Sequence, residues 1–251
     1  MKSPLIAEAL SLQADARQHG LTLRLIGSLA IGIRCPSHET WQTEMGRRAP
    51  VDIDLVGYQR EAKQIERLLE TRGYELHPSV RHSREFGLKR LIYTHPSAHK
   101  IDIFLDDLVM AHTITFVGRL EAETVTVSLA DLLLSKLQIH QVTENDLIDL
   151  LVLLAAKEFG AGPDEIDLAY VVSVLSADWG FYTTAMGNLA KMEDAVARHA
   201  APIGSARPLI ETRLEAFRHA VAEAPKSRRW RLRARIGTRL PWYEHVDDVD
   251  R

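Results

Sequence analysis

The sequence predicts a mixed α/β (α+β) fold, in which a sheet with flanking helices is followed by an all-α C-terminal region. Two short stretches, 51–56 and 100–105, alternate their side chains as half-buried strands do. The range 59–72 instead spaces its apolar residues three and four apart and ends at Gly73, which is typical of a helix. After 160–163, which contains two glycines and a proline, helical patterns take over.

Length and composition are those of a globular protein. The chain has 251 residues, of which 46% are hydrophobic and 26% charged, enough for one large domain or two modest ones. Its net charge of -3 gives no overall sign of nucleic-acid binding, although a local basic patch is compatible with it. Cys35 is the only cysteine, which excludes an internal disulfide. The N-terminus has no signal-peptide pattern and no apolar run is long enough for a membrane span, so we expect a cytoplasmic protein.

Two carboxylates stand two residues apart on the first predicted strand. Side chains alternate between the faces of a strand, so Asp52 and Asp54 share one face and Ile53 lies on the other. Two ionised carboxylates this close repel each other, and a cation between them relieves the repulsion. Carboxylate oxygens suit Mg²⁺, which also keeps water and substrate phosphates as ligands. The pair therefore indicates a metal site, and the alternative is a solvated edge strand.

A glycine–serine turn precedes this strand in the chain. The range 23–26 has strand character, Gly27 and Ser28 interrupt it, and 29–34 is apolar enough to begin a buried helix. Gly27 lets the backbone approach a ligand closely, Ser28 can cap the helix, and a helix N-terminus presents free N–H groups. These features suit a bound phosphate, although an ordinary turn has the same sequence.

The second predicted strand supplies a third carboxylate. Asp102 lies on the face opposite Ile101 and Ile103, in the same geometry as the first pair. Three carboxylates on neighbouring strands can hold two metal ions, one activating the attacking oxygen and one stabilising the leaving group. Asp106 and Asp107, which follow this strand, are interpreted as turn residues.

This set of motifs resembles the DNA polymerase beta-like nucleotidyltransferase superfamily. The signature of that superfamily is a glycine-rich turn, a D-x-D strand and a third acid on a later strand, here at Gly27, Ser28, Asp52, Asp54 and Asp102. The runs 129–138 and 146–151 are similar to the small bacterial branch that includes abortive-infection type toxins. The resemblance covers roughly residues 20 to 160.

Three regions are expected on this basis. A nucleotidyltransferase-like catalytic domain would occupy 1–127, a helical region 128–224, and a basic and then acidic tail 225–251. The resemblance implies metal-dependent transfer of a nucleoside monophosphate from a nucleoside triphosphate, such as ATP, to a hydroxyl acceptor. That acceptor is a small molecule, RNA or a protein.

The resemblance also implies roles for individual residues. Asp52, Asp54 and Asp102 would be catalytic and would bind Mg²⁺ or Mn²⁺, while Gly27 and Ser28 would hold the triphosphate. Two alternatives remain open. The same fold can serve as a non-catalytic nucleotide- or RNA-binding module, and a D-x-D strand also occurs in metal-dependent glycosyltransferases.

Two further predicted helices, 128–141 and 143–157, carry candidate charges. Lys136 lies on the inner face of the first, where it either reaches water or holds its ammonium against an anion. The resemblance implies that this anion is the nucleotide. Asp146 occupies a capping position of the second helix, and Asp149 is the freer of these two acids to act. Lys136 and Asp146 are therefore candidate nucleotide-binding residues.

Arginines and lysines gather near the predicted site. Arg47 and Arg48 come just before the D-x-D strand, where they either meet a triphosphate or are solvated. A second group either faces incoming phosphate or RNA or forms the solvated side of a strand; it comprises Arg81, Arg84, Lys89 and Arg90.

The C-terminal segment 226–239 interleaves arginines with a tryptophan, which suits the phosphates and bases of nucleic acid. RNA contact is expected at Arg228, Arg229, Trp230 and Arg231. A membrane surface is a second interpretation of this segment. A third is a solvated helix balanced by the acidic residues at 247–250.

Overall fold

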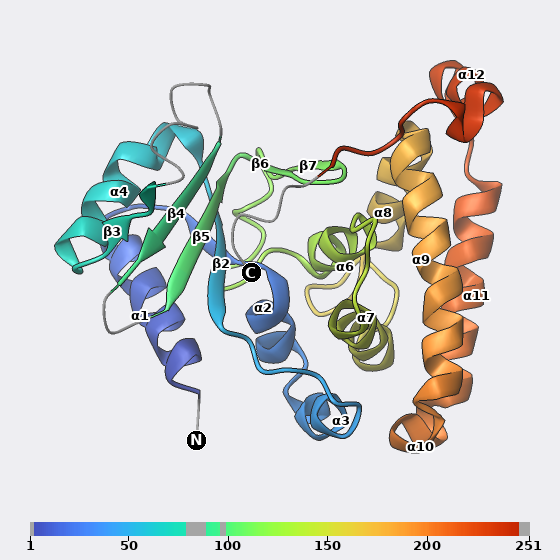
Figure 1. Cartoon of the computed structure of the whole chain (residues 1–251), viewed down its shortest axis with the longest axis horizontal. Coiled ribbons are helices and arrows are strands. Elements are labelled where there is room, and N and C mark those ends of the chain that lie inside the picture. The colour runs from blue at the N-terminus through green and yellow to red at the C-terminus, as the bar shows by residue number, and fades with distance from the viewer. Residues whose placement is uncertain (1–2, 79–88, 96–98, 246–251) are drawn as a thin grey trace.

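The computed structural model, which describes residues 3–78, 89–95 and 99–245, has a five-stranded mixed sheet with flanking helices and a C-terminal helical region (Figure 1). The predicted α+β class is therefore confirmed. The strand order is β1-β2-β5-β4-β3. The strands are β1 (Leu23–Leu25), β2 (Asp52–Gly57), β3 (Glu75–Leu76), β4 (Arg90–Thr94) and β5 (Lys100–Leu105).

Strands β2 and β5 run parallel, and the other pairs of neighbouring strands are antiparallel. Strands β2 and β5 form because every second side chain can be buried: Ile53, Leu55, Ile101 and Ile103 are all fully buried. Strands β4 and β5 pair antiparallel as a hairpin, with Ile92 opposite Asp102. These pairings place the carboxylate-bearing positions of β2 and β5 in the middle of the sheet.

Helices cover both sides of the sheet. Figure 1 shows α1 (Pro4–Gln18) and α4 (Ala62–Thr71) on one side, and α2 (Gly27–Arg34) on the other, next to the helical region. In α4 the residues Ile65 and Leu69 are fully buried, as their helical spacing predicts. The buried faces of β2 and β5 thus contribute to one continuous core with these helices.

The segment between α2 and β2 is more ordered than its polar sequence suggests. The range 36–48 contains a short 3₁₀ turn (Pro36–His38) and helix α3 (Glu39–Glu44). This order arises because two apolar side chains one turn apart, Trp41 and Met45, pack against the core. This segment therefore has a fixed path into β2.

A two-stranded sheet follows β5. It consists of β6 (Asp107–Val109) and β7 (Thr113–Thr115), which pair antiparallel. Among the described non-glycine residues, Asp106 alone has a positive φ, 63°, and its carboxylate accepts a hydrogen bond from the backbone N–H of Gln59 at 3.1 Å. The predicted turn role is thus confirmed for Asp106, but it was wrong for Asp107, which begins strand β6 and pairs with Thr115.

The helical region packs around helix α7. Its helices are α6 (Leu129–Leu137), α7 (Glu144–Ala156), α8 (Leu168–Ala177), α9 (Trp179–Arg198), α10 (Ala200–Ile203), α11 (Arg207–Glu223) and α12 (Arg228–Ile236). Ser128 caps α6, and Thr143 and Asp146 form a capping box at the start of α7, which confirms the predicted capping position of Asp146. Within the described part of the chain, no helix combines the length and apolar character that a membrane span requires.

Candidate functional site

Two of the predicted acids lie side by side on the neighbouring strands β2 and β5. Asp54 on β2 and Asp102 on β5 are direct register partners. Their chain neighbours Ile53 and Ile101 are fully buried on the opposite face, so the two carboxylates project from the same side of the sheet. Asp52, two residues before Asp54, lies on this face as well and is half-buried. The sheet thus presents all three predicted acids on one face.

The glycine turn lies directly against Asp54. Gly27 has a φ of +70°, and a Cβ built on it would stand 2.5 Å from Oδ2 of Asp54. The N–H of the preceding residue, Ile26, donates to the backbone carbonyl of Asp54 at 3.0 Å. Only a residue without a side chain allows this approach, so glycine is required here for both conformation and space. The beginning of α2 is therefore held next to the carboxylates, as predicted.

Ser28 has a different place in the helix from the one expected. The N-cap position of α2 is Ile26, with extended backbone and no side-chain cap hydrogen bond, and the helix begins at Gly27. The prediction that Ser28 caps the helix was wrong, because Ser28 lies inside the first turn and no side chain makes a capping hydrogen bond there. Ser28 lies in the first turn, beside the free N–H groups at the helix start.

The surroundings of Asp54 disfavour a negative charge. Burial, together with the negative charges of the neighbouring Asp52 and Asp102, raises the pKa of this carboxyl from its ordinary value of 3.8 to about 8. The positive charges of Lys136 and Arg90 act in the opposite direction but do not cancel these effects. A cation bound beside Asp54 would therefore stabilise its ionised carboxylate.

The raised pKa predicts how stability changes with pH in the presence of a chelator. Between the unfolded value of 3.8 and about 8, native Asp54 keeps a proton that the unfolded chain loses. The free energy of unfolding contributed by this group is therefore full at low pH and declines as pH rises to about 8. We expect the melting temperature of D54N to exceed that of the unsubstituted protein by a margin that grows over this range. Parallel melting curves across the range would contradict the assignment.

The third acid, Asp102, pairs with Arg90, a partner that was not predicted for either residue. Nε of Arg90 donates to Oδ1 of Asp102 at 2.8 Å, and Nη2 donates to Oδ2, which makes a bidentate ion pair. Arg90 lies on β4, diagonally across from Asp102, which is only 4% exposed. The alternation of β4 could have placed Arg90 on this face once the hairpin register was known.

The predicted basic group that contains Arg90 also includes Lys89, Arg81 and Arg84. Lys89 pairs with Asp107 at 2.8 Å and does not approach the site acids. Arg81 and Arg84 lie outside the described residues. The interpretation of Arg90 as part of a solvated strand face was wrong, because a buried carboxylate lies within its reach.

The metal-ligating role of the three acids stays a prediction. In the ranges 3–78, 89–95 and 99–245, no three His, Cys, Asp or Glu side chains gather closely enough to hold a metal ion. Asp102 instead faces Arg90, whereas Asp54 is pressed against Gly27. The chemistry of the donors still fits a hard divalent cation, because the acids supply only oxygen and because burial and the charges of Asp52 and Asp102 raise the pKa of Asp54.

A second charged cluster lies at the junction of the two halves. Nζ of Lys136 pairs with Asp146 at 2.8 Å and with Asp149 at 2.9 Å. Arg47 forks onto the same Asp149, with Nε to Oδ1 at 2.5 Å and Nη2 to Oδ2 at 2.9 Å. Asp149 is fully buried. Two cations and two carboxylates therefore form one buried network.

This network revises several sequence interpretations. Asp149 was expected to be free to act, but both of its oxygens are occupied by buried cations. Arg47 neither awaits a phosphate nor lies in solvent, since its side chain is only 6% exposed in this pair. Lys136 does hold its ammonium against anions, but those anions are protein carboxylates. The pKa of Lys136 is raised by Asp149 and Asp146 against the opposing effect of burial, so it stays charged.

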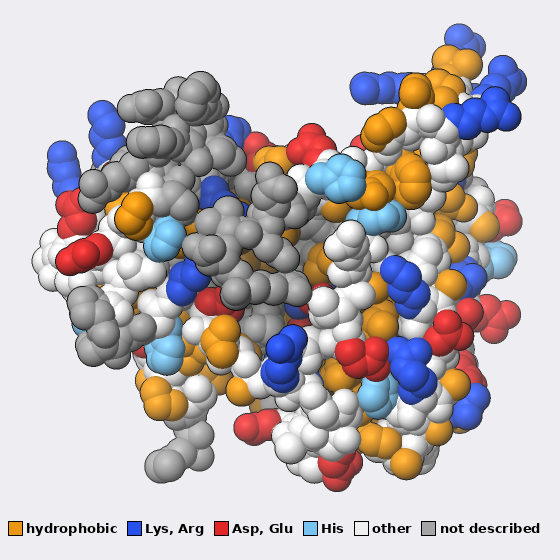
Figure 2. All heavy atoms as spheres, in the orientation of Figure 1, with side chains coloured by type: hydrophobic (Ala, Val, Ile, Leu, Met, Phe, Trp, Pro, Cys, Tyr) orange, Lys and Arg blue, Asp and Glu red, His pale blue; other side chains and the backbone are white. Residues whose placement is uncertain are grey.

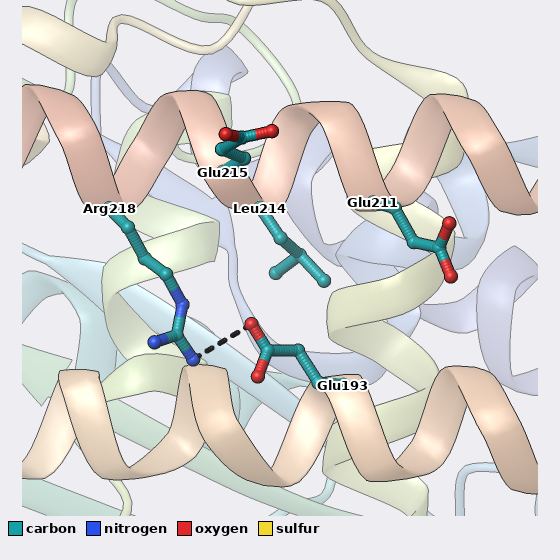
Figure 3. Close-up of a pocket in the computed structure, with 5 residues that line it drawn as sticks. All are labelled: Glu193, Glu211, Leu214, Glu215 and Arg218. Carbon is teal, nitrogen blue, oxygen red and sulfur yellow. Dashed lines mark ion pairs between the residues drawn. The ribbon is translucent and has the colours of Figure 1, made fainter.

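A surface groove lies elsewhere, between α9 and α11 (Figure 3). It is lined by Glu193, Glu211, Leu214, Glu215 and Arg218. Glu193 and Arg218 form an ion pair across it at 3.0 Å. None of the predicted site residues lines this groove, so it is separate from the carboxylate face of the sheet.

Comparisons with known proteins give only partial similarities. No family model and no curated protein matches the chain. Among solved structures, a lincomycin-bound lincosamide antibiotic adenylyltransferase, LnuA, is 16% identical with a TM-score of 0.39, covering 58% of this chain and 94% of its own. The antibiotic-resistance factor ANT(2'')-Ia is 14% identical with a TM-score of 0.36, covering 89% of this chain and 100% of its own. The abortive-infection branch is not represented by either structure.

Proposed function

We propose that this protein is a metal-dependent nucleotidyltransferase that moves a nucleoside monophosphate from a nucleoside triphosphate to a hydroxyl acceptor. The observation that carries the proposal is the contact between Gly27 and Asp54, which joins a helix N-terminus to a carboxylate pair on adjacent parallel strands. Free N–H groups at a helix start suit phosphate, and clustered carboxylates suit the cation that accompanies a triphosphate. A nucleoside triphosphate needs both, because the N–H groups bind its phosphates and the carboxylates bind its cation.

Each side chain has a role in this proposal. Asp52 and Asp54 would hold Mg²⁺ or Mn²⁺, with Asp102 as a third ligand, and the bound metal would supply positive charge for the phosphates and for the attacking oxygen. The first turn of α2, with Gly27 and Ser28, would bind the triphosphate. Asp102 would also accept the proton of the acceptor hydroxyl, which requires that Arg90 leave it.

Lys136 and Asp146 would act together rather than as separate nucleotide ligands. The charge of Lys136 lowers the pKa of Asp54, so its ammonium influences the carboxylate face while bonded to Asp146. Lys136 would thus partly offset negative charge behind the nucleotide. Asp146 would hold that ammonium in place.

Product analysis tests the proposed reaction. The protein would be incubated with each of the four nucleoside triphosphates, labelled on the α-phosphate, together with Mg²⁺ and a panel of hydroxyl compounds or a cell extract. The expected result is transfer of the label to an acceptor with release of pyrophosphate, and loss of transfer in a chelator. Release of inorganic phosphate alone, or no labelled product with any triphosphate, would contradict the proposal.

Substitution of Gly27 gives a more specific prediction. In G27A, the added Cβ would fall 2.5 Å from Oδ2 of Asp54, and the residue would keep a φ of +70° that alanine disfavours. We expect activity to fall by about a hundredfold, because a displacement of about 1 Å at the site costs roughly that factor. The matched control is G187A, where a Cβ meets nothing within 4 Å. Wild-type activity in G27A would show that the turn does not position the site.

The bond between Arg90 and Asp102 favours a second candidate, a nucleotide-binding module without catalysis. An ion pair that occupies both oxygens of Asp102 leaves that carboxylate unavailable to a metal or a proton. If this state persists, calorimetry should show nucleotide binding that does not depend on Mg²⁺ and yields no product. Binding that requires Mg²⁺ would favour the transferase.

A further inference from the structure

The C-terminal helix α12 has an unusual distribution of charge. The segment 226–240 contains seven basic residues and no acidic one, although the whole chain has a net charge of -3. Figure 1 shows α12 at the end of α9 and α11, on the far side of the helical region from the sheet. Figure 2 shows basic and hydrophobic side chains together on this projecting corner of the molecule.

One face of α12 is fixed to the protein. The ring of Trp230 packs edge-on against Tyr182 of α9 at 5.2 Å, and the guanidinium of Arg233 lies 4.6 Å above the ring of Trp179. Arg233 also donates to the backbone carbonyls of Gly237 and Leu240. The tryptophan that the sequence offered for base stacking is thus turned toward the protein.

The opposite face carries an exposed aliphatic stripe. Leu232 and Ile236 lie one turn apart on α12 and are 60% and 41% exposed, and Leu240, which follows the 3₁₀ turn after the helix, is 55% exposed. Most amphipathic helices place such a stripe on the core of the protein, but here it points to solvent. No other described element covers these side chains.

Arginines border this stripe on both sides. Arg228 and Arg229 stand four and three residues before Leu232, and Arg235 stands three residues after it. This spacing places all three next to Leu232 on the helix surface. All three are exposed, and none pairs with a carboxylate in the part of the chain that the structure describes. The acidic residues at 247–250 lie outside that part.

We propose that this outer face of α12 docks the protein on an anionic phospholipid surface. When a helix lies in a membrane interface, its arginines are at the level of the lipid phosphates, and the aliphatic stripe between them enters the acyl boundary. The outer face of α12 has this arrangement. Nucleic acid would satisfy the arginines but would leave the aliphatic stripe in water, since the aromatic ring for base stacking faces inward. The charge and the apolar stripe together select lipid.

Vesicle binding by the full chain tests this surface. The protein would be sedimented with phosphatidylcholine vesicles and with vesicles that also contain phosphatidylglycerol. We expect binding only to the anionic vesicles, weakened by salt. In R229Q/R235Q, affinity should fall roughly 25-fold, because each arginine near the surface contributes about fivefold.

A second variant separates lipid from nucleic acid. L232Q/I236Q keeps every charge and uses a good helix former, so α12 should persist in circular dichroism, whereas vesicle affinity should fall roughly tenfold. L209Q is the matched control, because Leu209 is 42% exposed on α11 and lies outside the proposed face. Three results would overturn the proposal: no preference for anionic vesicles, unchanged vesicle binding in L232Q/I236Q, or tighter binding to single-stranded RNA than to anionic vesicles.

Discussion

Substitution of Asp54 by asparagine is expected to lower transfer of labelled nucleotide by roughly a thousandfold or more, because a metal-binding carboxylate contributes several kcal/mol to such a reaction. Asparagine has nearly the same size, and Asp54 lies beside Gly27, so the packing at this contact should persist. Removing this half-buried carboxyl, whose pKa is raised to about 8, should also leave the melting temperature unchanged or increase it at that pH. Loss of activity without loss of stability would therefore identify a functional group.

The control for this variant is D107N. Asp107 is another strand carboxylate and pairs with Lys89 at 2.8 Å, away from the glycine turn. Its substitution should leave transfer within about twofold, as expected for an exposed ion pair. Full transfer activity in D54N would refute the proposed reaction, whatever the stability of the variant.

The largest effect on stability is expected for Asp149. D149N removes the charge of a fully buried carboxylate and leaves Arg47 and Lys136 with only Asp146 to neutralise them. Breaking a buried pair on one side costs about 3–5 kcal/mol, which for a chain of this size lowers Tm by roughly 10 °C. Denaturant titration and calorimetry would both measure this loss.

An exposed carboxylate provides the comparison. Asp164 also pairs with two cations, Lys157 at 2.6 Å and Arg34 at 3.3 Å, but its side chain is 71% exposed. D164N should change the free energy of unfolding by less than about 1 kcal/mol.

A double variant tests the pair directly. R47M/D149N should lose less stability than the two single variants combined, because both remove the same interaction. Equal effects of D149N and D164N would mean that the network is not stabilising.

The parts of the fold that were predictable are those with strong local patterns. The alternation around Ile53 and Ile101 indicates strands wherever they lie in the sheet, and the spacing of Ile65 and Leu69 indicates a helix. Caps at Ser128 and Thr143 were predictable because a cap uses residues only three positions away. Helix α3 was missed because its polar sequence has too few apolar residues to show a period.

The candidate site was only half predictable for a physical reason. Asp52, Asp54 and Asp102 could be placed on one face because strand geometry fixes where their side chains point. Their partners depend on pairings across long stretches of chain, and Arg47 and Asp149 are separated by 102 positions. An acid in the middle of an apolar helix was a signal that Asp149 needs a buried cation, but no local rule names which one.

The pair of Arg47 and Asp149 has a mechanical consequence for the molecule as a whole. It ties the segment that enters β2 to the central helix of the C-terminal half, across the boundary expected at residues 127 and 128. The two halves should therefore melt together in a single calorimetric peak, and cutting the chain between them should not release two independently folding pieces.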